Sequence, residues 1–464
     1  MSNSNLSTIN TRPAALLSIG VKRFTRMCVL IVEKAVPDPF VIAILLTLLT
    51  AILAFIFAPA ASVPQVVTSW YDGVFKIASF AFLVALTLVT GHALSTSRPI
   101  ARLLRHFASL PNTAAGAMTM TFFVSMAAGL LNWAVGLVVA GLFAREVAKR
   151  VHVDFAWLVA ASYAGWSFYV CGMSSSIALV SATAGSPMNI IESVTGKVLP
   201  MSEFLTSPLN FVPLLVLAVL LPMILRMMMP TPDQTVSADP QKLIEEDTVR
   251  QEEAPNTLAG RLDHGAWINM ILIVAGVGYI GLKLVEGAFK MDLNMLVLVF
   301  LLSGLALHRT PKAYLRAIDN AARIAGPILL QFPLYGGIMG VMSATGLADV
   351  VSKWFITFST TETLPFWSYA SSVLISLFVP SAGGHWIVQA PFVVPAAEHL
   401  GVHQSAVAIA VALGEGAANM IQPMWVIPLL AIARVGMGRV MGFTVIIFFA
   451  MFAVMGTSML ILSL

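Results

Sequence analysis

Cysteine and charge are both scarce in this chain of 464 residues. It has only two cysteines, Cys28 and Cys171, and neither a CxxC pair nor a Cys/His metal-ligand spacing occurs. Only 10% of the residues are charged, with a formal net charge of +4. No glycine-rich loop ends in Lys-Ser or Lys-Thr, as a phosphate-binding loop would. These absences argue against a disulfide framework, a Cys/His metal centre and an ATP-driven transporter, and we expect no cofactor.

Apolar residues make up 58% of the chain, and the mean hydropathy is +0.88. A soluble domain of this composition would expose large apolar patches. Several apolar runs approach the ~20 residues that a membrane-spanning helix needs. The sequence therefore predicts an all-α polytopic membrane protein, whose basic residues mark helix ends and membrane topology, not nucleic-acid binding. The apolar segments are 40–58, 74–96, 116–148, 155–183, 208–228, 267–287, 292–308, 321–346, 367–399, 404–433 and 440–463.

The N-terminus lacks the features of a cleavable signal peptide. Lys22, Arg23 and Arg26 interrupt its first apolar stretch, and no small-residue cleavage site follows. Residues 14–35 are better explained as an amphipathic helix on the inner membrane surface.

Segments 116–148 and 367–399 are too long for one crossing. A helix of 33 residues would measure about 50 Å, against a hydrocarbon core of ~30 Å. Basic residues flank the first segment on both sides, whereas the second has no basic cluster on either flank. We expect each to be a re-entrant hairpin, the first opening inward and the second outward. The alternative is a tilted helix with an interfacial extension, or two short spans.

With two hairpins and nine full spans, and the N-terminus in the cytoplasm, the charges follow the positive-inside rule. On this topology 21 of the 26 Lys and Arg residues face inward. The outer side keeps only Lys76, Lys197, Lys283, Lys290 and Lys353. The predicted location is a bacterial inner membrane.

Two halves of the chain show a similar order of segments, about 250 residues apart. Leu131-Asn132-Trp133 in the first hairpin corresponds to Gly384-His385-Trp386 in the second, and the broken spans 155–183 and 404–433 also correspond. Inverted repeats of this kind are typical of transporters. The predicted units are an interfacial segment 1–35, repeat 1 at 36–228, a cytoplasmic and mobile linker at 229–266, an inverting span at 267–291, and repeat 2 at 292–464.

Polar and small residues break these apolar segments near the middle of the membrane. The second hairpin turns at Val379-Pro380-Ser381-Ala382-Gly383-Gly384, where proline ends one arm and free N–H groups at the start of the next favour an anion. We expect the spans to break at Gly172-Met173-Ser174-Ser175-Ser176, and at Gly414-Glu415-Gly416 with Asn419, Gln422 and Pro423. Unwound backbone in a membrane needs protein, water, an ion or substrate as its partner.

These breaks supply the candidate binding residues. The predicted substrate-binding residues are Asn132, Trp133, Ser174, Ser175, Ser176, Ser381, Gly383, Gly384, His385, Gln389 and Asn419. Structural alternatives are open for each: His385 and Asn132 could brace the tips, the serines could bond to helix carbonyls, and the tryptophans could be packing anchors. Glu415, the only acid deep in a predicted span, could carry a proton, pair with His385 or cap the break. A Na⁺ site near Asn132, Gly172, Asn419 and Gln422 is also possible.

Several runs in the chain resemble the bacterial short-chain fatty acid transporter family, within the ion transporter superfamily. They are Asn132-Trp133, Ala144-Arg145-Glu146-Val147, Gly91-His92-Ala93-Leu94, Arg226-Met227-Met228-Met229-Pro230 and Val379-Pro380-Ser381-Ala382-Gly383-Gly384-His385-Trp386. The resemblance implies uptake of acetoacetate, butyrate and similar acids, a homodimer and elevator-like movement. The chain departs from the family pattern at Ala382 and Gly416-Ala417, so the preferred acid is not fixed.

The resulting hypothesis is a secondary active importer of short-chain monocarboxylates, driven by Na⁺ or H⁺. A dicarboxylate or other small organic anion carrier should need a second cationic partner, and the predicted core has no Lys or Arg. A passive anion channel is a further alternative. An intramembrane enzyme would have only Ser381 and His385 as a candidate pair, without a well-placed third residue, so no enzymatic activity is expected.

Overall fold

The computed structural model describes residues 39–58, 61–233, 235–239, 241, 243, 257–289, 292–377, 379, 382–433 and 435–463. The interfacial helix expected at 14–35 lies outside these residues, as do Cys28, Pro380 and Ser381.

Within the described residues the regular secondary structure is helical, which confirms the predicted all-α class. The first half holds α2 (Pro39–Phe57), α3 (Val63–Lys76), α4 (Ala78–Ser95), α5 (Arg98–Ala108), α6 (Ala114–Leu131), α7 (Trp133–Ala148), α8 (Phe155–Trp166), η1 (Ser167–Cys171), α9 (Ser176–Ala182), α10 (Ile190–Thr195), α11 (Met201–Leu205) and α12 (Pro208–Met227). The second holds α14 (Leu258–Asp263), α15 (Ala266–Val285), α16 (Leu293–His308), α17 (Pro311–Thr345), α18 (Leu347–Phe358), α19 (Leu364–Ser376), α20 (Ala382–Leu400), α21 (Gln404–Ala418), α22 (Pro423–Ala433) and α23 (Met437–Ile461).

Five helical stretches among the described residues are long and apolar enough to cross a bilayer. They are Val63–Ser95, Ala114–Leu131, Pro208–Met227, Ala266–Val285 and Met437–Ile461. The pair Leu329–Thr345 and Leu347–Phe358, which is bent by 79°, adds a sixth if the two helices form one span, and otherwise is a re-entrant loop. Shorter apolar helices include Leu293–His308 and Gln404–Ala418. The structure thus supports several membrane crossings, while the count of nine spans and two hairpins stays a prediction.

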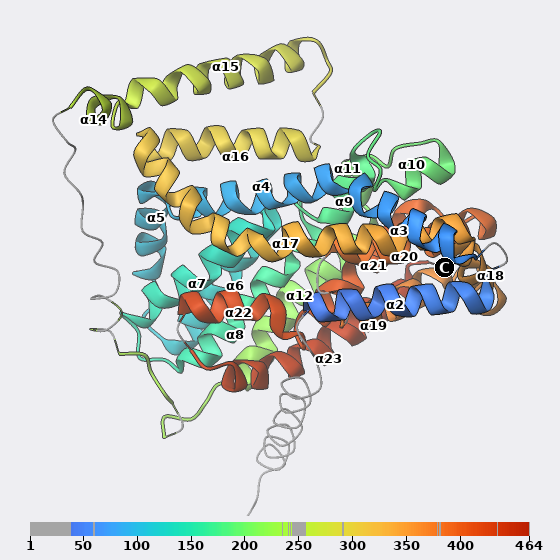
Figure 1. Ribbon diagram of the computed structural model, residues 1–464. Coiled ribbons are helices and arrows are strands. Elements are labelled where there is room, and N and C mark those ends of the chain that lie inside the picture. Colours follow the sequence, from blue (N-terminus) through green and yellow to red (C-terminus); the bar gives the residue numbers. More distant parts are fainter. Residues whose placement is uncertain are drawn as a thin grey trace, which may run out of the picture.

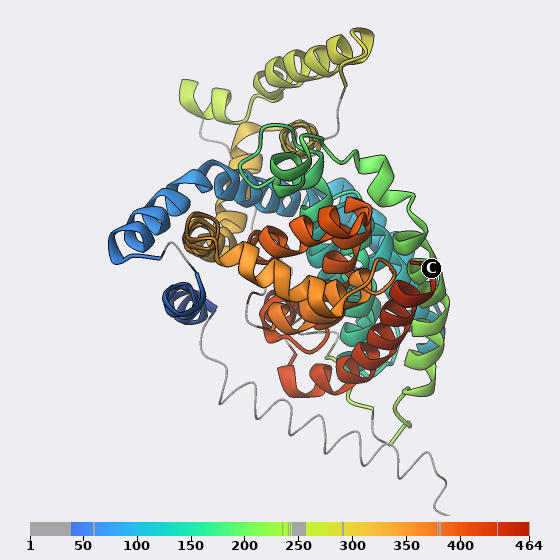
Figure 2. The same cartoon turned by 90° about the vertical axis from the view of Figure 1, so that its right-hand side faces the viewer.

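The helices form two groups that pack against each other (Figures 1 and 2). In the first group, the long helix α17 packs along α2, α3 and α4, and α16 packs on α4. In the second, α6, α7, α8 and α12 pack with α19, α21, α22 and α23. Contacts of α4 with α7 and of α17 with α20 join the groups. The second group contains the breaks at which binding residues were expected.

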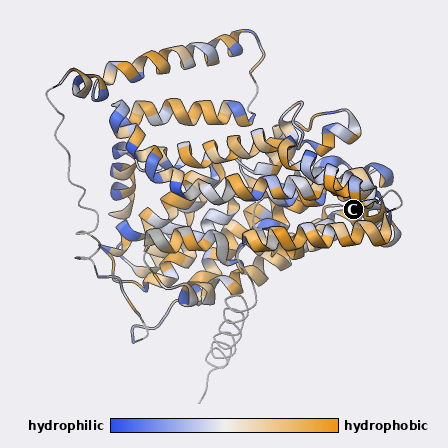
Figure 3. Ribbon diagram, in the orientation of Figure 1, coloured by the Kyte–Doolittle hydropathy of each residue, from blue (hydrophilic) through white to orange (hydrophobic). Residues whose placement is uncertain are grey.

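Helix α15 stands apart from both groups and packs mainly on α16 (Figure 1). It is predominantly hydrophobic along its length (Figure 3), and only Asn269 among its residues is buried. An apolar helix that is exposed on nearly every side requires lipid or another protein surface around it.

Three of the four expected breaks lie where the sequence placed them. Asn132 separates α6 from α7 with an extended backbone, and residues 172–175 separate η1 from α9. Helix α19 ends at Ser376 and α20 begins at Ala382, with the described residues Leu377 and Val379 outside both helices. The fourth prediction is correct only in part. Gly414-Glu415-Gly416 do not unwind, because α21 continues through Ala418, but the break at 419–422 includes the expected Asn419 and Gln422 and ends at Pro423. A Cβ on Gly414 would lie 2.5 Å from Ser372 Cβ, so this glycine serves close helix packing.

Two further expectations differ from the structure. The segments expected at 74–96 and 321–346 begin earlier, as α3 and α17, because amphipathic turns precede their apolar cores. The linker expected to be mobile is docked where it is described. The Val236 N–H donates to Asp154 Oδ2 (3.0 Å), and Arg439 Nη2 donates to the same oxygen (2.6 Å). The linker is thereby attached at Val236 to the start of α8, where Asp154 also binds Arg439 near the start of α23.

Candidate functional site

The first break is built around the side chain of Asn132, which is fully buried. Its Oδ1 accepts hydrogen bonds from the N–H groups of Ala134 and Val135, both at 2.9 Å, and so caps α7. The N–H of Trp133 donates to Ser174 Oγ at 2.7 Å. The first N–H groups of α7 are therefore satisfied within the protein, while Asn132 Nδ2 has no hydrogen-bond partner among the described residues.

Gly172 allows the two breaks of the first half to meet. A Cβ at this position would lie 2.6 Å from Leu130 Cα, so no larger residue fits without a backbone shift. The next residue, Met173, donates its N–H to Leu130 O at 2.8 Å. Ser174 and Ser175 are buried, and Ser176 begins α9 and is partly exposed. The turn at 172–175 is thereby fixed against the end of α6.

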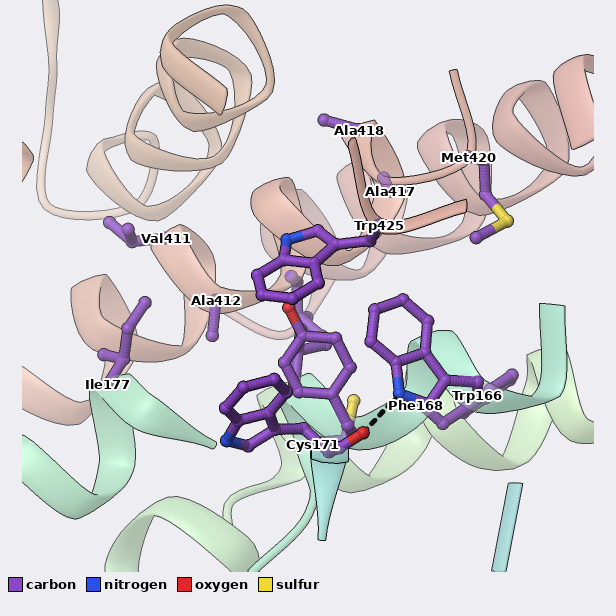
Figure 4. Close-up of a cluster of buried hydrophobic side chains, with 14 of the residues drawn as sticks. Trp166, Phe168, Cys171, Ile177, Val411, Ala412, Ala417, Ala418, Met420 and Trp425 are labelled. Carbon is purple, nitrogen blue, oxygen red and sulfur yellow. Dashed lines mark hydrogen bonds between the residues drawn. The ribbon is translucent and has the colours of Figure 1, made fainter. Parts of the chain in front are cut away.

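Aromatic side chains surround this junction. The Trp133 ring meets Trp425 of α22 edge-on, with centroids 5.3 Å apart. Trp166 Nε1 donates to the Trp133 carbonyl at 2.7 Å. Figure 4 shows Trp166 and Trp425 in the same buried cluster as Phe168 and Cys171. Trp425 Nε1 is buried without a hydrogen-bond partner in the described part of the chain.

Glu415 lies at the centre of a second polar cluster, and it is fully buried. Tyr169 Oη donates to its Oε1 at 2.6 Å, and Asn419 Nδ2 lies 3.4 Å from the same oxygen. Tyr163 Oη donates to the Asn419 carbonyl at 2.9 Å. Tyr163 and Tyr169 come from the first broken span, and Glu415 and Asn419 from the second. The cluster therefore ties the two broken spans together.

His385 and Gln389 belong together, but the proposed pairing of His385 with Glu415 is not what the structure shows. His385 Nε2 hydrogen-bonds to Gln389 Oε1 (2.5 Å), and Gln389 Nε2 donates to Ser368 O (2.9 Å) and Ser371 Oγ (3.0 Å). Glu415 is bonded instead to Tyr169 and Asn419. These bonds brace α20 against α19, as in the structural alternative for His385, and leave His385 Nδ1 without a partner among described residues.

Both tips approach Phe80 of α4. A Cβ on Gly383 would lie 2.9 Å from Phe332 Cε1 and 3.4 Å from Phe80 Cε1, so the second tip packs directly on aromatic rings. Gly384 is similarly close to Tyr335, at 2.6 Å. Phe80 also lines a small cavity beside Trp133 and Ser176. Residues from the two tips therefore lie near one aromatic side chain.

Several buried oxygen atoms near the second break lack partners in the described structure. They are Glu415 Oε2, Asn419 Oδ1 and Gln422 Oε1. Gln422 uses its amide nitrogen to donate to the carbonyl of Ser376, at the end of α19. Carboxylate and amide oxygens are chemically suited to Na⁺, and a carboxylate is also suited to H⁺. No group of three or more His, Cys, Asp and Glu side chains that could hold a metal ion occurs among the described residues.

The expected residues thus fall into three neighbourhoods. The first contains Asn132, Trp133 and Ser174, the second contains Glu415 and Asn419, and the third contains His385 and Gln389. Sequence reasoning missed Tyr163, Trp166, Tyr169 and Trp425. Aromatic residues in apolar spans usually serve packing. Only the polar atoms of these four residues, near the breaks, could have indicated a place in the functional site.

Comparison with known proteins agrees with a transport role. The short chain fatty acid transporter family matches residues 20–462. A protein of Escherichia coli (strain K12), named provisionally as a short-chain fatty acid transporter, is 39% identical over 95% of this chain and 100% of its own length. A protein with the same name from Haemophilus influenzae (strain ATCC 51907 / DSM 11121 / KW20 / Rd) is 36% identical over 94% of this chain and 99% of its own length.

Solved structures of two transporters share the fold. The Alcanivorax borkumensis YdaH transporter has a TM-score of 0.57 at 15% identity, covering 91% of this chain and 98% of its own. Neisseria gonorrhoeae MtrF, described among antimetabolite efflux pumps, has a TM-score of 0.57 at 14% identity, covering 95% and 97%. The family match and the two relatives show that the chain is a multi-pass helical membrane transporter, and not an enzyme. The chain belongs to the short-chain fatty acid transporter family.

Proposed function

We propose that this protein is a secondary active importer of short-chain monocarboxylates, such as acetoacetate and butyrate, across a bacterial inner membrane. The observation that carries the proposal is the set of buried polar atoms at the helix breaks that have no partner among the described residues. Such atoms are costly in an apolar interior, and a ligand or ion that bonds to them offsets that cost. The family, whose description names short-chain fatty acids, gives the substrate class.

The carboxylate would bind near the first tip. Asn132 Nδ2 and Trp425 Nε1 are buried donors without partners in the described structure, on two helices that meet through the Trp133–Trp425 contact. The hydroxyls of Ser174, Ser175 and Ser176 lie along the adjacent break. Ser381, Gly383, Gly384, His385, Gln389 and Asn419 would complete the site from the second half. The buried His385 Nδ1 supports a contribution from that side.

Cation coupling would use the second break. Glu415 would carry H⁺, or its Oε2 would bind Na⁺ together with Asn419 Oδ1 and Gln422 Oε1. A second Na⁺ position near Asn132 and Gly172 is part of the same proposal. Because Tyr169 bonds Glu415 across the two broken spans, binding of the cation would alter the contact between them.

The transport mechanism would be elevator-like. The group containing α6–α9, α12 and α19–α23 would move against the group containing α2–α4, α16 and α17. The repeated order of helix, break and helix in α6–α7 and α19–α20, and again in α8–α9 and α21–α22, supports two repeats. Their inversion, the re-entrant hairpins and the cytoplasmic N-terminus rest on the distribution of Lys and Arg. A homodimer would cover part of the exposed apolar surface of α15.

The same scaffold could serve other small anions. A dicarboxylate carrier is the main alternative, and the polar clusters described above contain no Lys or Arg, which favours a single-charge ligand. A passive anion channel would not accumulate substrate. Export is the other direction to test, because one structural neighbour is described among efflux pumps.

Reconstituted vesicles test the proposal directly. Uptake of labelled butyrate or acetoacetate should saturate, and accumulation should follow an imposed Na⁺ or pH gradient and vanish when that gradient is collapsed. Gradient-independent equilibration would indicate a channel, and saturable uptake of succinate alone would indicate the dicarboxylate alternative. Absence of saturable uptake of any C2–C6 acid would end the monocarboxylate proposal.

A further inference from the structure

A small cavity lies between the two helix groups, where α4 and α16 face α7 and α9. The space that the centre of a water molecule can occupy there is about 10 Å³. That is about the minimum for one water molecule, and hence comparable to one methyl group. Its walls are Phe80, Val84 and Thr87 of α4, Trp133 of α7, Ser176, Leu179 and Val180 of α9, and Leu293 of α16.

The lining is apolar except for the hydroxyls of Thr87 and Ser176. Thr87 Oγ1 already donates to Leu83 O at 2.9 Å, so its hydroxyl hydrogen is used within α4. Ser176, at the start of α9, is partly exposed and supplies the other hydroxyl. Trp133, on the same wall, follows Asn132 at the first break. The cavity therefore has the hydroxyl-bearing Ser176 at one of the breaks, and its remaining lining includes Phe80, Val84, Leu179 and Leu293, which we call its apolar end.

We infer that this cavity receives the alkyl tail of the carboxylate and sets the longest chain that the protein accepts, with Val84 and Leu179 as the residues that determine specificity. The inference rests on the proposed function. An acid whose carboxylate lies at the breaks would direct its last carbons toward Val84 and Leu179. Each additional methylene beyond the available space must displace closely packed side chains, and a tight apolar pocket discriminates one methylene by roughly 10–200-fold.

A larger hollow among the described residues does not fit this role. It is an open groove lined by α5, α6 and α12, with Phe123, Val124 and Arg226 among its walls. Phe123 is 42% exposed, and the groove borders none of the helix breaks. The small cavity is adjacent to Trp133 and lies between the groups whose relative movement is proposed.

Two opposite substitutions at one position test the inference. Val84→Ala should raise the uptake of hexanoate relative to that of butyrate by roughly tenfold, because the smaller side chain enlarges the apolar end of the cavity. Val84→Ile should lower the uptake of butyrate relative to that of acetate by roughly tenfold, because the larger side chain fills the cavity. Val139→Ala is the matched control, since Val139 is buried to the same degree as Val84 but does not line the cavity. If Val84→Ala does not fold, Leu179→Ala enlarges the same end.

Binding should be measured beside uptake, as the rise in unfolding temperature that each C2–C8 acid produces in the purified full chain. Changed chain-length profiles in the Val84 variants, with an unchanged profile in Val139→Ala, support the inference. If wild-type protein takes up short-chain acids and the Val84 variants keep its profile, the inference fails and the proposed function stands. If acids stabilise the protein with shifted profiles but no uptake occurs, the proposed transport fails and the inference stands. If the acids neither bind to the protein nor are taken up, both the proposed function and the inference are overturned.

Discussion

Glu415 is the residue on which the proposed coupling depends. It is fully buried, one carboxylate oxygen accepts from Tyr169, and the other has no partner among the described residues. An ionisable group held in this way in a membrane protein is energetically costly, which favours a role in carrying a cation. Its position in the sequence is enough to make Glu415 a candidate coupling residue, since no other acid lies deep in a predicted span.

Glu415→Gln should uncouple accumulation from the driving gradient. Glutamine keeps the acceptor for Tyr169 but cannot bind a proton or supply a charge to Na⁺. We expect gradient-driven accumulation of butyrate in vesicles to fall at least tenfold, equivalent to ~1.4 kcal/mol, while exchange of butyrate across the membrane persists. Glu398→Gln, at an exposed acid near the end of α20, should behave like wild type. Wild-type accumulation in Glu415→Gln would exclude this residue from coupling.

Tyr169 should contribute more to stability than Tyr163. Both are fully buried phenols that bond the second broken span, but Tyr169 donates to a carboxylate and Tyr163 to a backbone carbonyl. A hydrogen bond to a charged group, such as that of Tyr169, contributes about 1.5–3 kcal/mol to stability. An average side-chain hydrogen bond inside a membrane protein, taken here for Tyr163, contributes about 0.6 kcal/mol. Tyr169→Phe should therefore lower the unfolding temperature of the purified protein more than Tyr163→Phe does. Equal decreases would show that the carboxylate gains no special stabilisation from Tyr169.

The breaks show how far sequence pattern reaches at the scale of one element. Asn132 is predictable because a polar residue interrupts a segment too long for one span, and in the structure its side chain caps α7, which is a local interaction. The unwinding predicted at Gly414 and Gly416 does not occur. A glycine that permits unwinding and one that permits close packing cannot be distinguished in the sequence. Gly414 lies against Ser372 and Gly416 against Val170, contacts that only the folded chain reveals. For the same reason the docking of Val236 on Asp154 could not be foreseen.

The pair α6 and α7 depends on one close approach between its arms. A Cβ on Gly136 would lie 2.5 Å from Gly129 Cα and 3.0 Å from Trp166 Cδ1. Gly136→Ala should separate the arms and displace Trp166, which bonds the Trp133 carbonyl. We expect a clear fall in unfolding temperature and a loss of substrate uptake. Gly278→Ala, in the open part of α15, should be neutral or slightly stabilising, because alanine is the better helix former.

At the scale of the whole molecule, sequence pattern and structure agree on an all-helical protein with paired breaks, whereas the placement of its parts across the membrane depends on charge. Helix α6 alone is long enough to cross a bilayer, so length does not decide between a hairpin arm and a span. The flanking charges favour a hairpin, because a single crossing by the α6–α7 segment would place either Arg102 and Arg105 or Lys149 and Arg150 outside, against the positive-inside rule.

Single cysteines labelled from each side of the membrane test this arrangement. In a chain whose Cys28 and Cys171 are replaced, cysteines at Thr113 and Lys149 should both react only from the cytoplasm. Cysteines at Glu362 and His399 should both react only from outside. Cysteines at Gly265 and Ala288, which flank α15, should react from opposite sides and serve as the control for a full crossing. If Thr113 and Lys149 react from opposite sides, α6–α7 is a span, the halves are not inverted hairpin repeats, and the two tips cannot share one pocket.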